Sequence, residues 1–482
     1  MPEIDDAGVP DSARALVDGV TAHGRGIPAG ASSFSAESRC RQLLGRCEAQ
    51  HSLNALSWQA TPRLLEQARQ LDRALAAGEP AGRLAGLPLV VKDNIDTPGF
   101  PTSAGNAWLR RDLPPRPAPV WRALEEAGAL LLGKSSMHEL AAGATSNNPV
   151  FGRVGNPRTT DRIPGGSSGG TAAAIAAGLA PAGLGTDTSG SLRTPAAFCG
   201  IAALRPSTGP RRAYSLEGIV PLVAAFDTAG PMARSVDDLV LLHEVIARKK
   251  VGPPPEAGTL RIGVPRGGLW EALAPAVDAV CIGALERFRA AGAALVEFDA
   301  GTLVGEAVRL QISLGRLQRR SELRAWLAAR GHDIPFDAFV EAIRSRDVRA
   351  IYVADAAGDN DQAAAEAATL RRHLAVLGQR WLALMDGHAL DAVAYPTTPV
   401  TAPLVSQARG EPDDSILHLG ARVPLGAVVS RNARFAAALG LPALALPAGC
   451  SVDGLPVGIE LAARQGDDEA LLALGLRMSL VL

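Results

Sequence analysis

Apolar and polar positions along the chain form helix-like blocks and short strand-like runs. From about Ser35 to Ala77, apolar residues recur at helical spacing, which predicts helix. The apolar run LPLVV, which ends at Val91, is typical of a short buried strand. The stretch VWRALEEAGALLLG predicts a helix followed by a strand, and LERFRAAGAALVEFD and RWLALMDGHALDAVAYPTTP repeat that order. This alternation predicts an α/β fold with a largely parallel or mixed sheet.

The segment from about 304 to 384 has a different pattern. It is rich in Arg and Ala, carries few strand signals, and contains the amphipathic stretches RSELRAWLAARG and QAAAEAATLRRHLAVLGQRWLALMD. We therefore predict one large domain over 1–482. In it, 35–303 and 385–482 form the α/β core that carries the site, and 304–384 forms a variable helical cap.

Composition and charge argue against several classes of protein. The chain has 482 residues, 47% hydrophobic and 20% charged, which allows a packed core. A net charge of −1 argues against general nucleic-acid binding. Five scattered cysteines without a CxxC pair argue against a disulfide framework or a zinc site. The acidic N-terminal stretch is not typical of a secretory signal, and no apolar run reaches membrane-spanning length, so we expect a soluble, cytoplasmic protein.

Two glycine-rich loops carry the candidate chemistry. GGSSGGT at 165–171 lacks the Walker lysine and the spacing of GxGxxG or GxSxG, which leaves a tight turn, a phosphate site at a helix N-terminus or a catalytic loop. GTDTSGSLRTP at 185–195 is a run of small residues that leads to Ser191. Its backbone N–H groups could converge on an oxyanion, although a plain β-turn has the same composition. Together the loops favour acyl transfer to a serine.

A serine nucleophile needs a base, and a lysine is the best candidate. Of the eight histidines, His138 lies in the most suggestive context, but none occupies a comparable loop. Lys92 directly follows the predicted buried strand. Burial lowers the pKa of a lysine, so a neutral Lys92 could accept a serine proton. The alternative is a surface lysine at a strand end.

These motifs resemble the amidase signature family of serine hydrolases. VVKDNID, PGGSSGGT and GTDTSGSLRTPAAFCG match its pattern and spacing, and FDTAGPMARSVDD, DAVAYPTTPVTAP and LGLPALALPAGCSVDGLPVGIEL extend the match. The resemblance covers about residue 35 to the end and is weakest near 304–384. It implies a single α/β/α amidase-signature domain whose central mixed β-sheet is covered by helices.

The resemblance also implies a role for each site residue. Ser191 would be the nucleophile, Ser167 a bridging serine held by a cis peptide bond, and Lys92 the base. The oxyanion hole would come from the N–H groups of Thr188, Ser189, Gly190 and Ser191. A backbone carbonyl near Ala141 would bind substrate. No metal or cofactor is expected.

One position departs from the family pattern. Ser189 stands where the family usually has glycine, and it would be strained if the loop needed a positive φ there. Its hydroxyl would otherwise contact the substrate or the surroundings of Asp187. Arg193 has a structural ion pair as its simplest role, and no carboxylate-binding arginine is evident.

Several strings most resemble the mandelamide and indoleacetamide hydrolase branch, which implies a small-molecule aryl or arylalkyl amide substrate. Anilides, esters and carbamates are further candidates, which would make the enzyme an amidase or a urethanase. The alternatives are the glutaminase subunit of a tRNA-dependent amidotransferase and a phosphate-binding protein that uses GGSSGG. We expect a monomer or homodimer with neither a nucleic-acid nor a membrane partner.

Overall fold

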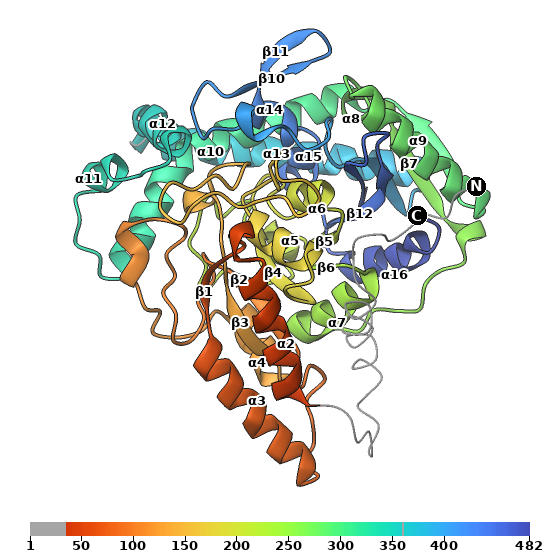
Figure 1. The fold of residues 1–482 in the computed structure, drawn as a ribbon. Coiled ribbons are helices and arrows are strands. Elements are labelled where there is room, and N and C mark those ends of the chain that lie inside the picture. Colours follow the sequence, from red (N-terminus) through yellow and green to blue (C-terminus); the bar gives the residue numbers. More distant parts are fainter. Residues whose placement is uncertain (1–34, 359–360) are drawn as a thin grey trace.

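A mixed sheet of eleven strands runs through the protein, as the computed structural model of residues 35–358 and 361–482 shows (Figure 1). The acidic N-terminal stretch interpreted above lies outside the described residues. The strand order is β1-β3-β2-β4-β6-β5-β12-β13-β9-β7-β8. Neighbours β3, β2 and β4 are parallel, as are β9, β7 and β8, whereas every other neighbouring pair is antiparallel. The predicted α/β fold with a central mixed sheet is confirmed.

The bounds of the strands in the large sheet are these: β1 Leu56–Gln59, β2 Pro88–Lys92, β3 Leu130–Ser135, β4 Ala182–Asp187, β5 Ala202–Arg205, β6 Thr228–Ala233, β7 Arg261–Pro265, β8 Ala294–Phe298, β9 Ala392–Pro396, β12 Ala443–Cys450 and β13 Pro456–Ala462. A separate hairpin pairs β10 (Ser415–His418) with β11 (Ala421–Pro424).

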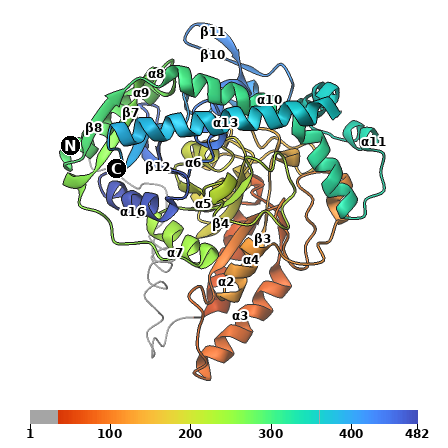
Figure 2. The same ribbon diagram turned by 180° about the vertical axis from the view of Figure 1, so that it is seen from behind.

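Helices cover both faces of this sheet (Figures 1 and 2). Two positions in β12 and β13 show the two faces. Leu444 is paired with Leu461, which points to the face opposite to that of Gly458. A Cβ on Gly458 would meet Ala197, whereas Leu444 lies against Gly475. α6 (Arg193–Cys199) therefore packs on one face and α16 (Asp468–Ser479) on the other. The remaining helices outside 301–387 are α2 Ala36–Ala49, α3 Thr61–Ala76, α4 Pro119–Glu126, α5 Gly169–Ala176, α7 Val236–Ala247, α8 Arg266–Leu269, α9 Pro275–Ala290, α14 Leu425–Val429 and α15 Ala433–Ala438.

The first predicted helical region needs a correction. Between α2 and α3 the chain forms β1, which pairs with β3 at the edge of the sheet. Asn54 adopts a left-handed conformation (φ 52°) and ends the short turn after α2, and a proline at the start of α3 begins the next helix. Helical spacing alone missed the four-residue strand between them. The predicted strands before Lys92 and Gly133 and the other two helix–strand pairs are confirmed.

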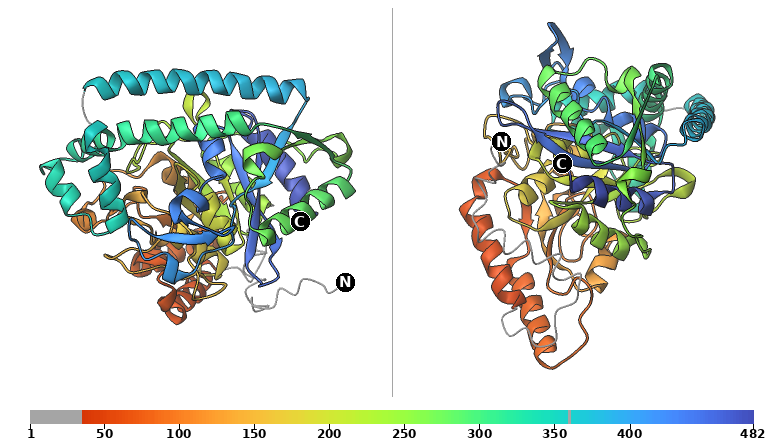
Figure 3. Two further views of the ribbon diagram at one scale, coloured as in Figure 1. Left: turned by 90° about the horizontal axis from the view of Figure 1, so that it is seen from above. Right: turned by 90° about the vertical axis from the view of Figure 1, so that its right-hand side faces the viewer.

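The segment near 304–384 is helical, as predicted. It contains α10 (Gly301–Ala329), α11 (Phe336–Glu341), α12 (Arg346–Ala354) and α13 (Asp361–Gly387). The long helices α10 and α13 lie side by side across the molecule (Figure 3). Leu314 of α10 and Trp381 of α13 belong to the same hydrophobic cluster as the central strands, so the segment shares the main core. No described helix is both long enough and apolar enough to span a membrane.

Candidate active site

The two serine loops meet at the floor of one cavity. The peptide bond between Gly166 and Ser167 is cis, and the N–H of Ser168 donates to the carbonyl oxygen of Ser191 at 3.2 Å. Ser191 lines the cavity, whereas Ser167 is fully buried. A Cβ on Gly166 would lie 2.9 Å from the carbonyl carbon of Ala144. Glycine is therefore required where this loop passes the cavity wall.

Lys92 ends the buried strand β2 and points at the first serine of the pair. Its Nζ donates to Ser167 Oγ at 2.8 Å and to Thr186 Oγ1 at 2.8 Å. Asn94 donates to the same threonine hydroxyl at 3.1 Å. Thr186 reaches Lys92 because β2 and β4 are parallel neighbours. The sequence therefore brings the lysine and the serine together from positions far apart in the chain.

The surroundings of Lys92 favour its neutral form. The side chain is fully buried, and among the described residues no carboxylate lies within ion-pair distance of its Nζ. Burial lowers the pKa of Lys92 to about 7, although the more distant carboxylates of Asp187 and Asp227 act in the opposite direction. The prediction of a lysine in a poorly solvated place is confirmed, and the surface alternative is wrong.

The loop from 188 to 191 is shaped by Asp187. The N–H of Gly190 donates to Asp187 Oδ1 at 2.8 Å, so this predicted oxyanion donor is engaged by the protein itself. Among the described residues, none accepts a hydrogen bond from the N–H of Ser189 or Ser191. Gly190 has a φ of 116°, and a Cβ there would lie 2.6 Å from that of Ala433. This is the loop position that demands glycine.

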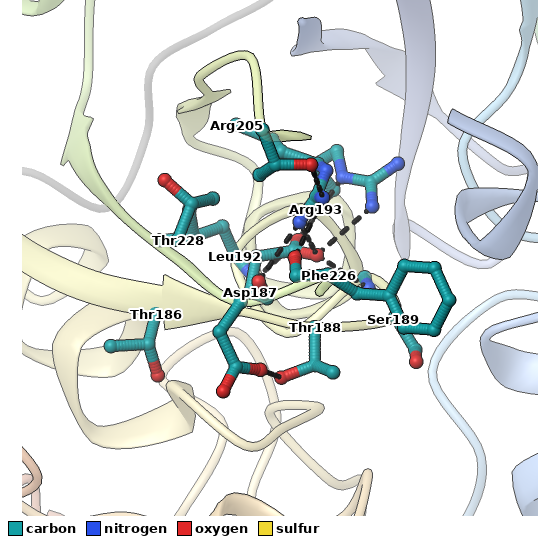
Figure 4. A network of polar contacts seen from close by, with 12 residues as sticks. Thr186, Asp187, Thr188, Ser189, Leu192, Arg193, Arg205, Phe226 and Thr228 are labelled. Atoms are coloured by element: carbon teal, nitrogen blue, oxygen red, sulfur yellow. Dashed lines mark hydrogen bonds and ion pairs between the residues drawn. The ribbon is translucent and has the colours of Figure 1, made fainter. Parts of the chain in front are cut away.

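Asp187 is held by two buried arginines (Figure 4). Arg193 Nη2 and Arg205 Nη1 each lie 3.0 Å from Asp187 Oδ1, and Arg193 Nη1 also lies 2.5 Å from Glu460. Burial alone would raise the pKa of Asp187, but the two guanidinium groups hold it well below its usual range. The ion pair expected for Arg193 is confirmed, and the two arginines hold the carboxylate that accepts from the N–H of Gly190.

Ser189 does not carry the strain that a positive φ would impose. The positive φ falls on the next residue, Gly190. The Ser189 hydroxyl accepts a hydrogen bond from Gln311 Nε2 at 3.3 Å, and the same amide donates to the Thr188 carbonyl at 3.0 Å. The hydroxyl therefore contacts α10 rather than the Asp187 carboxylate. Strain is expected at Ser189 only if the loop needs a positive φ there. The positive φ lies at Gly190, so Ser189 is not strained.

The cavity above the loops has a volume of about 460 Å³. One wall carries Ala141, which has a φ of 56° and follows buried His138. Ile351 of α12 and Leu425 of α14 also line the cavity. His138 Nε2 lies 3.1 Å from Asp347, which ties the Ala141 turn to α12. The backbone N–H of His138 donates to the Ser167 carbonyl oxygen at 3.2 Å, but its imidazole contacts Asp347 and Thr145 rather than the side chains of Lys92 or Ser167.

The phosphate-site alternative for GGSSGG has little room. The loop residues are buried, Gly169 N–H donates to Ser146 Oγ at 3.1 Å, and Gly170 N–H donates to the Ser136 carbonyl at 3.1 Å. These donors at the start of α5 are therefore already used. An anion would have to displace protein groups to reach them.

Sequence reasoning missed several polar residues of the site. Thr186, Asp227, Gln311 and Arg434 each contact the loops or line the cavity. Thr186 lies in GTDTSGSLRTP and Asp227 in FDTAGPMARSVDD, so their place in these motifs could have identified them as site residues. Gln311 and Arg434 lie in segments without a recognised pattern, and only the packing of α10 and α15 brings them to the site.

The comparisons with known proteins point to one family. The amidase family model matches residues 40–472. The chain is 35% identical to an indoleacetamide hydrolase of Agrobacterium vitis, covering 90% of this chain and 91% of that protein. It is also 35% identical to a mandelamide hydrolase of Pseudomonas putida, covering 85% and 81%. A solved structure described as an amidase superposes with a TM-score of 0.80 at 30% identity, covering 98% and 99%.

Proposed function

The chain belongs to the amidase family of C–N hydrolases, and we propose that it cleaves amides with Ser191 as nucleophile, Ser167 as proton relay and Lys92 as base. The observation that supports this most directly is the 2.8 Å contact from Lys92 Nζ to Ser167 Oγ in a buried environment. A lysine that is neutral near pH 7 has a lone pair for a serine proton.

In the first half of the reaction, Ser191 Oγ forms a bond to the substrate carbonyl carbon. Its proton passes to Ser167 Oγ, and the proton of Ser167 passes to Lys92. The carbonyl oxygen becomes an oxyanion, and the unengaged N–H groups of Ser189 and Ser191 are its donors in this proposal, with Thr188 beside them. Gly190, whose N–H binds Asp187, supports the loop shape instead.

Collapse of the tetrahedral intermediate breaks the C–N bond. The leaving nitrogen takes a proton from Ser167, which recovers one from Lys92, and an acyl-enzyme on Ser191 remains. A water molecule then attacks the acyl carbon and loses its proton to Ser167, which passes one to Lys92. The bond between Ser191 Oγ and the acyl carbon breaks, Ser191 regains a proton from Ser167, and Ser167 regains one from Lys92, so that the acid is released and the three side chains return to their starting protonation states.

We propose primary amides of aryl or arylalkyl acids as substrates. Two relatives, each 35% identical, are an indoleacetamide and a mandelamide hydrolase, which supports this class. The cavity volume suits a small acyl group, and Leu222, Ile351 and Leu425 give it apolar walls. Anilides, esters and carbamates belong to the same test because their attacked carbon is similar.

The test is hydrolysis of an aryl primary amide, an anilide, an aryl ester and an aryl carbamate by wild type and variants. Ser191→Ala and Lys92→Ala are expected to reduce turnover by about 10²–10⁴-fold or more while the protein stays folded. Ser167→Ala should fall similarly, whereas Ser168→Ala, the neighbouring serine that bonds to Thr186, is the matched control and should lose much less.

Full activity in Ser191→Ala or Lys92→Ala would refute the proposed assignment. Turnover of glutamine alone, and only with a copurifying partner, would instead indicate an amidotransferase subunit. ATP binding without any turnover would indicate the phosphate-binding alternative.

A further inference from the structure

The charged side chains that line the cavity, other than Arg434, have polar or charged partners outside it. Asp347 lies 3.1 Å from His138, Glu411 lies 3.3 Å from Arg346, and Asp414 lies 3.2 Å from Arg409. Arg319 forms an ion pair with Asp355. Glu411, Asp414 and Arg319 are each paired with an opposite charge and therefore contribute little net charge to a bound molecule.

Arg434 is the exception among the described lining residues. It lies in α15, one residue after the Ala433 that packs against Gly190, and no described carboxylate is within ion-pair distance of its guanidinium. Among the described residues its one acceptor is Gln311 Oε1, at 3.2 Å from Nη1. A guanidinium has five N–H donors, so most of them have no acceptor in the described part of the chain.

Gln311 fixes where this arginine stands. Its Oε1 accepts from Arg434, while its Nε2 donates to the Thr188 carbonyl and the Ser189 hydroxyl. The guanidinium is thus held one side chain away from the loop that carries Ser191. Burial, together with nearby Arg319, lowers the pKa of Arg434 to about 10, which still leaves it protonated at neutral pH.

A half-buried cation without a counter-ion beside a substrate cavity is costly unless a ligand neutralises it. We propose that Arg434 binds an anionic group of the substrate, so that the preferred substrates are amides whose acyl part carries a carboxylate. The proposal rests on the proposed amidase function: a primary amide releases only ammonia, so the acyl part must fill the cavity. It names a specificity-determining residue that sequence reasoning did not find.

The test uses the ortho, meta and para isomers of carboxy-phenylacetamide, each paired with the nitro-phenylacetamide of the same geometry. Nitro and carboxylate groups have nearly the same shape but differ in charge. The kcat/KM values of wild type, Arg434→Gln and Arg434→Lys are compared. Arg422→Gln removes the same charge from the exposed β11 strand and is the matched control.

In wild type, at least one carboxylate isomer should exceed its nitro partner by about 10–100-fold, the range expected for a charge-assisted hydrogen bond. Arg434→Gln should abolish that ratio and change nitro substrates by less than about threefold. Arg434→Lys should keep part of the preference because it keeps the charge. Arg422→Gln should keep all of it.

Equal loss for both substrate types in Arg434→Gln would overturn the proposal, because it would show that Arg434 only positions Gln311. Absence of any carboxylate preference in wild type would overturn it too. Binding to the Ser191→Ala protein, with and without Arg434→Gln, is measured by calorimetry. Binding is measured without turnover, so it decides the role of Arg434 even if the proposed hydrolysis fails. It also separates a loss of substrate binding in Arg434→Gln from a loss of catalytic rate.

Discussion

Two fully buried lysines at the ends of neighbouring parallel strands have opposite environments. Lys92 ends β2, and Lys134 lies next to the end of β3. Val91 is paired with Lys134 and Lys92 with Ser135, so the alternation of side chains sends the two lysines to opposite faces of the sheet. Asp93 continues the alternation and lies on the side of Lys134, 3.4 Å from its Nζ.

The close partners of the two amines differ. Burial lowers the pKa of Lys134 too, but the Asp93 carboxylate acts in the opposite direction, and Lys134 Nζ also donates to the carbonyls of Ile95 and Pro101, at 2.8 and 3.3 Å. Lys92 has hydroxyl groups as its close partners, and burial lowers its pKa to about 7. Burial is common to both residues; the carboxylate is what separates them.

The largest effects are expected when either amine is removed. Lys92→Met should lower kcat by about 10²–10⁴-fold, the usual contribution of a general base, with little loss of stability because an apolar chain replaces a buried amine. Single-turnover kinetics and chemical denaturation measure the two effects. A folded variant that retains its kcat would contradict the role of base. A variant that unfolds would contradict the expected small loss of stability.

Lys134→Met should lower the stability of the protein and leave its activity nearly unchanged. It leaves the buried Asp93 carboxylate without its cation, which costs about 3–5 kcal/mol in the free energy of unfolding. Activity per folded molecule should stay within about threefold of wild type. The double variant Asp93→Asn with Lys134→Met removes both charges and should recover part of the stability. Failure of the double variant to recover any would argue that the pair is not the cause.

The pH dependence of activity reports the protonation state of Lys92. Because the pKa of Lys92 is lowered to about 7, the fraction of neutral amine increases as the pH rises through that value. We expect kcat/KM to rise about tenfold per pH unit below pH about 7 and to level off above it. The residual activity of Lys92→Met should lack this limb. A wild-type profile that is flat from about pH 5 to 9 would contradict a titrating lysine.

The smallest effect is expected from the hydroxyl that holds Lys92. Thr186→Val keeps the shape but removes the 2.8 Å contact, so kcat should fall about tenfold, in line with one lost hydrogen bond. Thr171→Val removes a buried hydroxyl contact with Ser135 and is the matched control, with activity per folded molecule close to wild type. Equal losses of kcat in both variants would show that the effect is not specific to Lys92.

The sequence predicted much of the fold because the strongest patterns are local. The runs before Lys92 and Gly133 are short, apolar and flanked by turn residues, so they are recognisable as buried strands. β1 was missed because four residues between two helices carry too little periodic signal. The order of the eleven strands could not be derived, since β4 next to β6 and β13 next to β9 are contacts between distant segments.

The candidates for chemistry are recognisable in the sequence: a lysine after a buried strand and two serines in loops of small residues. Their types and their neighbours in the chain carry that information. Tertiary structure alone decided that Lys92 contacts Ser167 and Thr186, that Gly190 donates to Asp187, and that Arg434 reaches the cavity. The reason is physical: burial, charge pairing and donor availability depend on what lies within a few ångströms in space, and distant segments supply those neighbours.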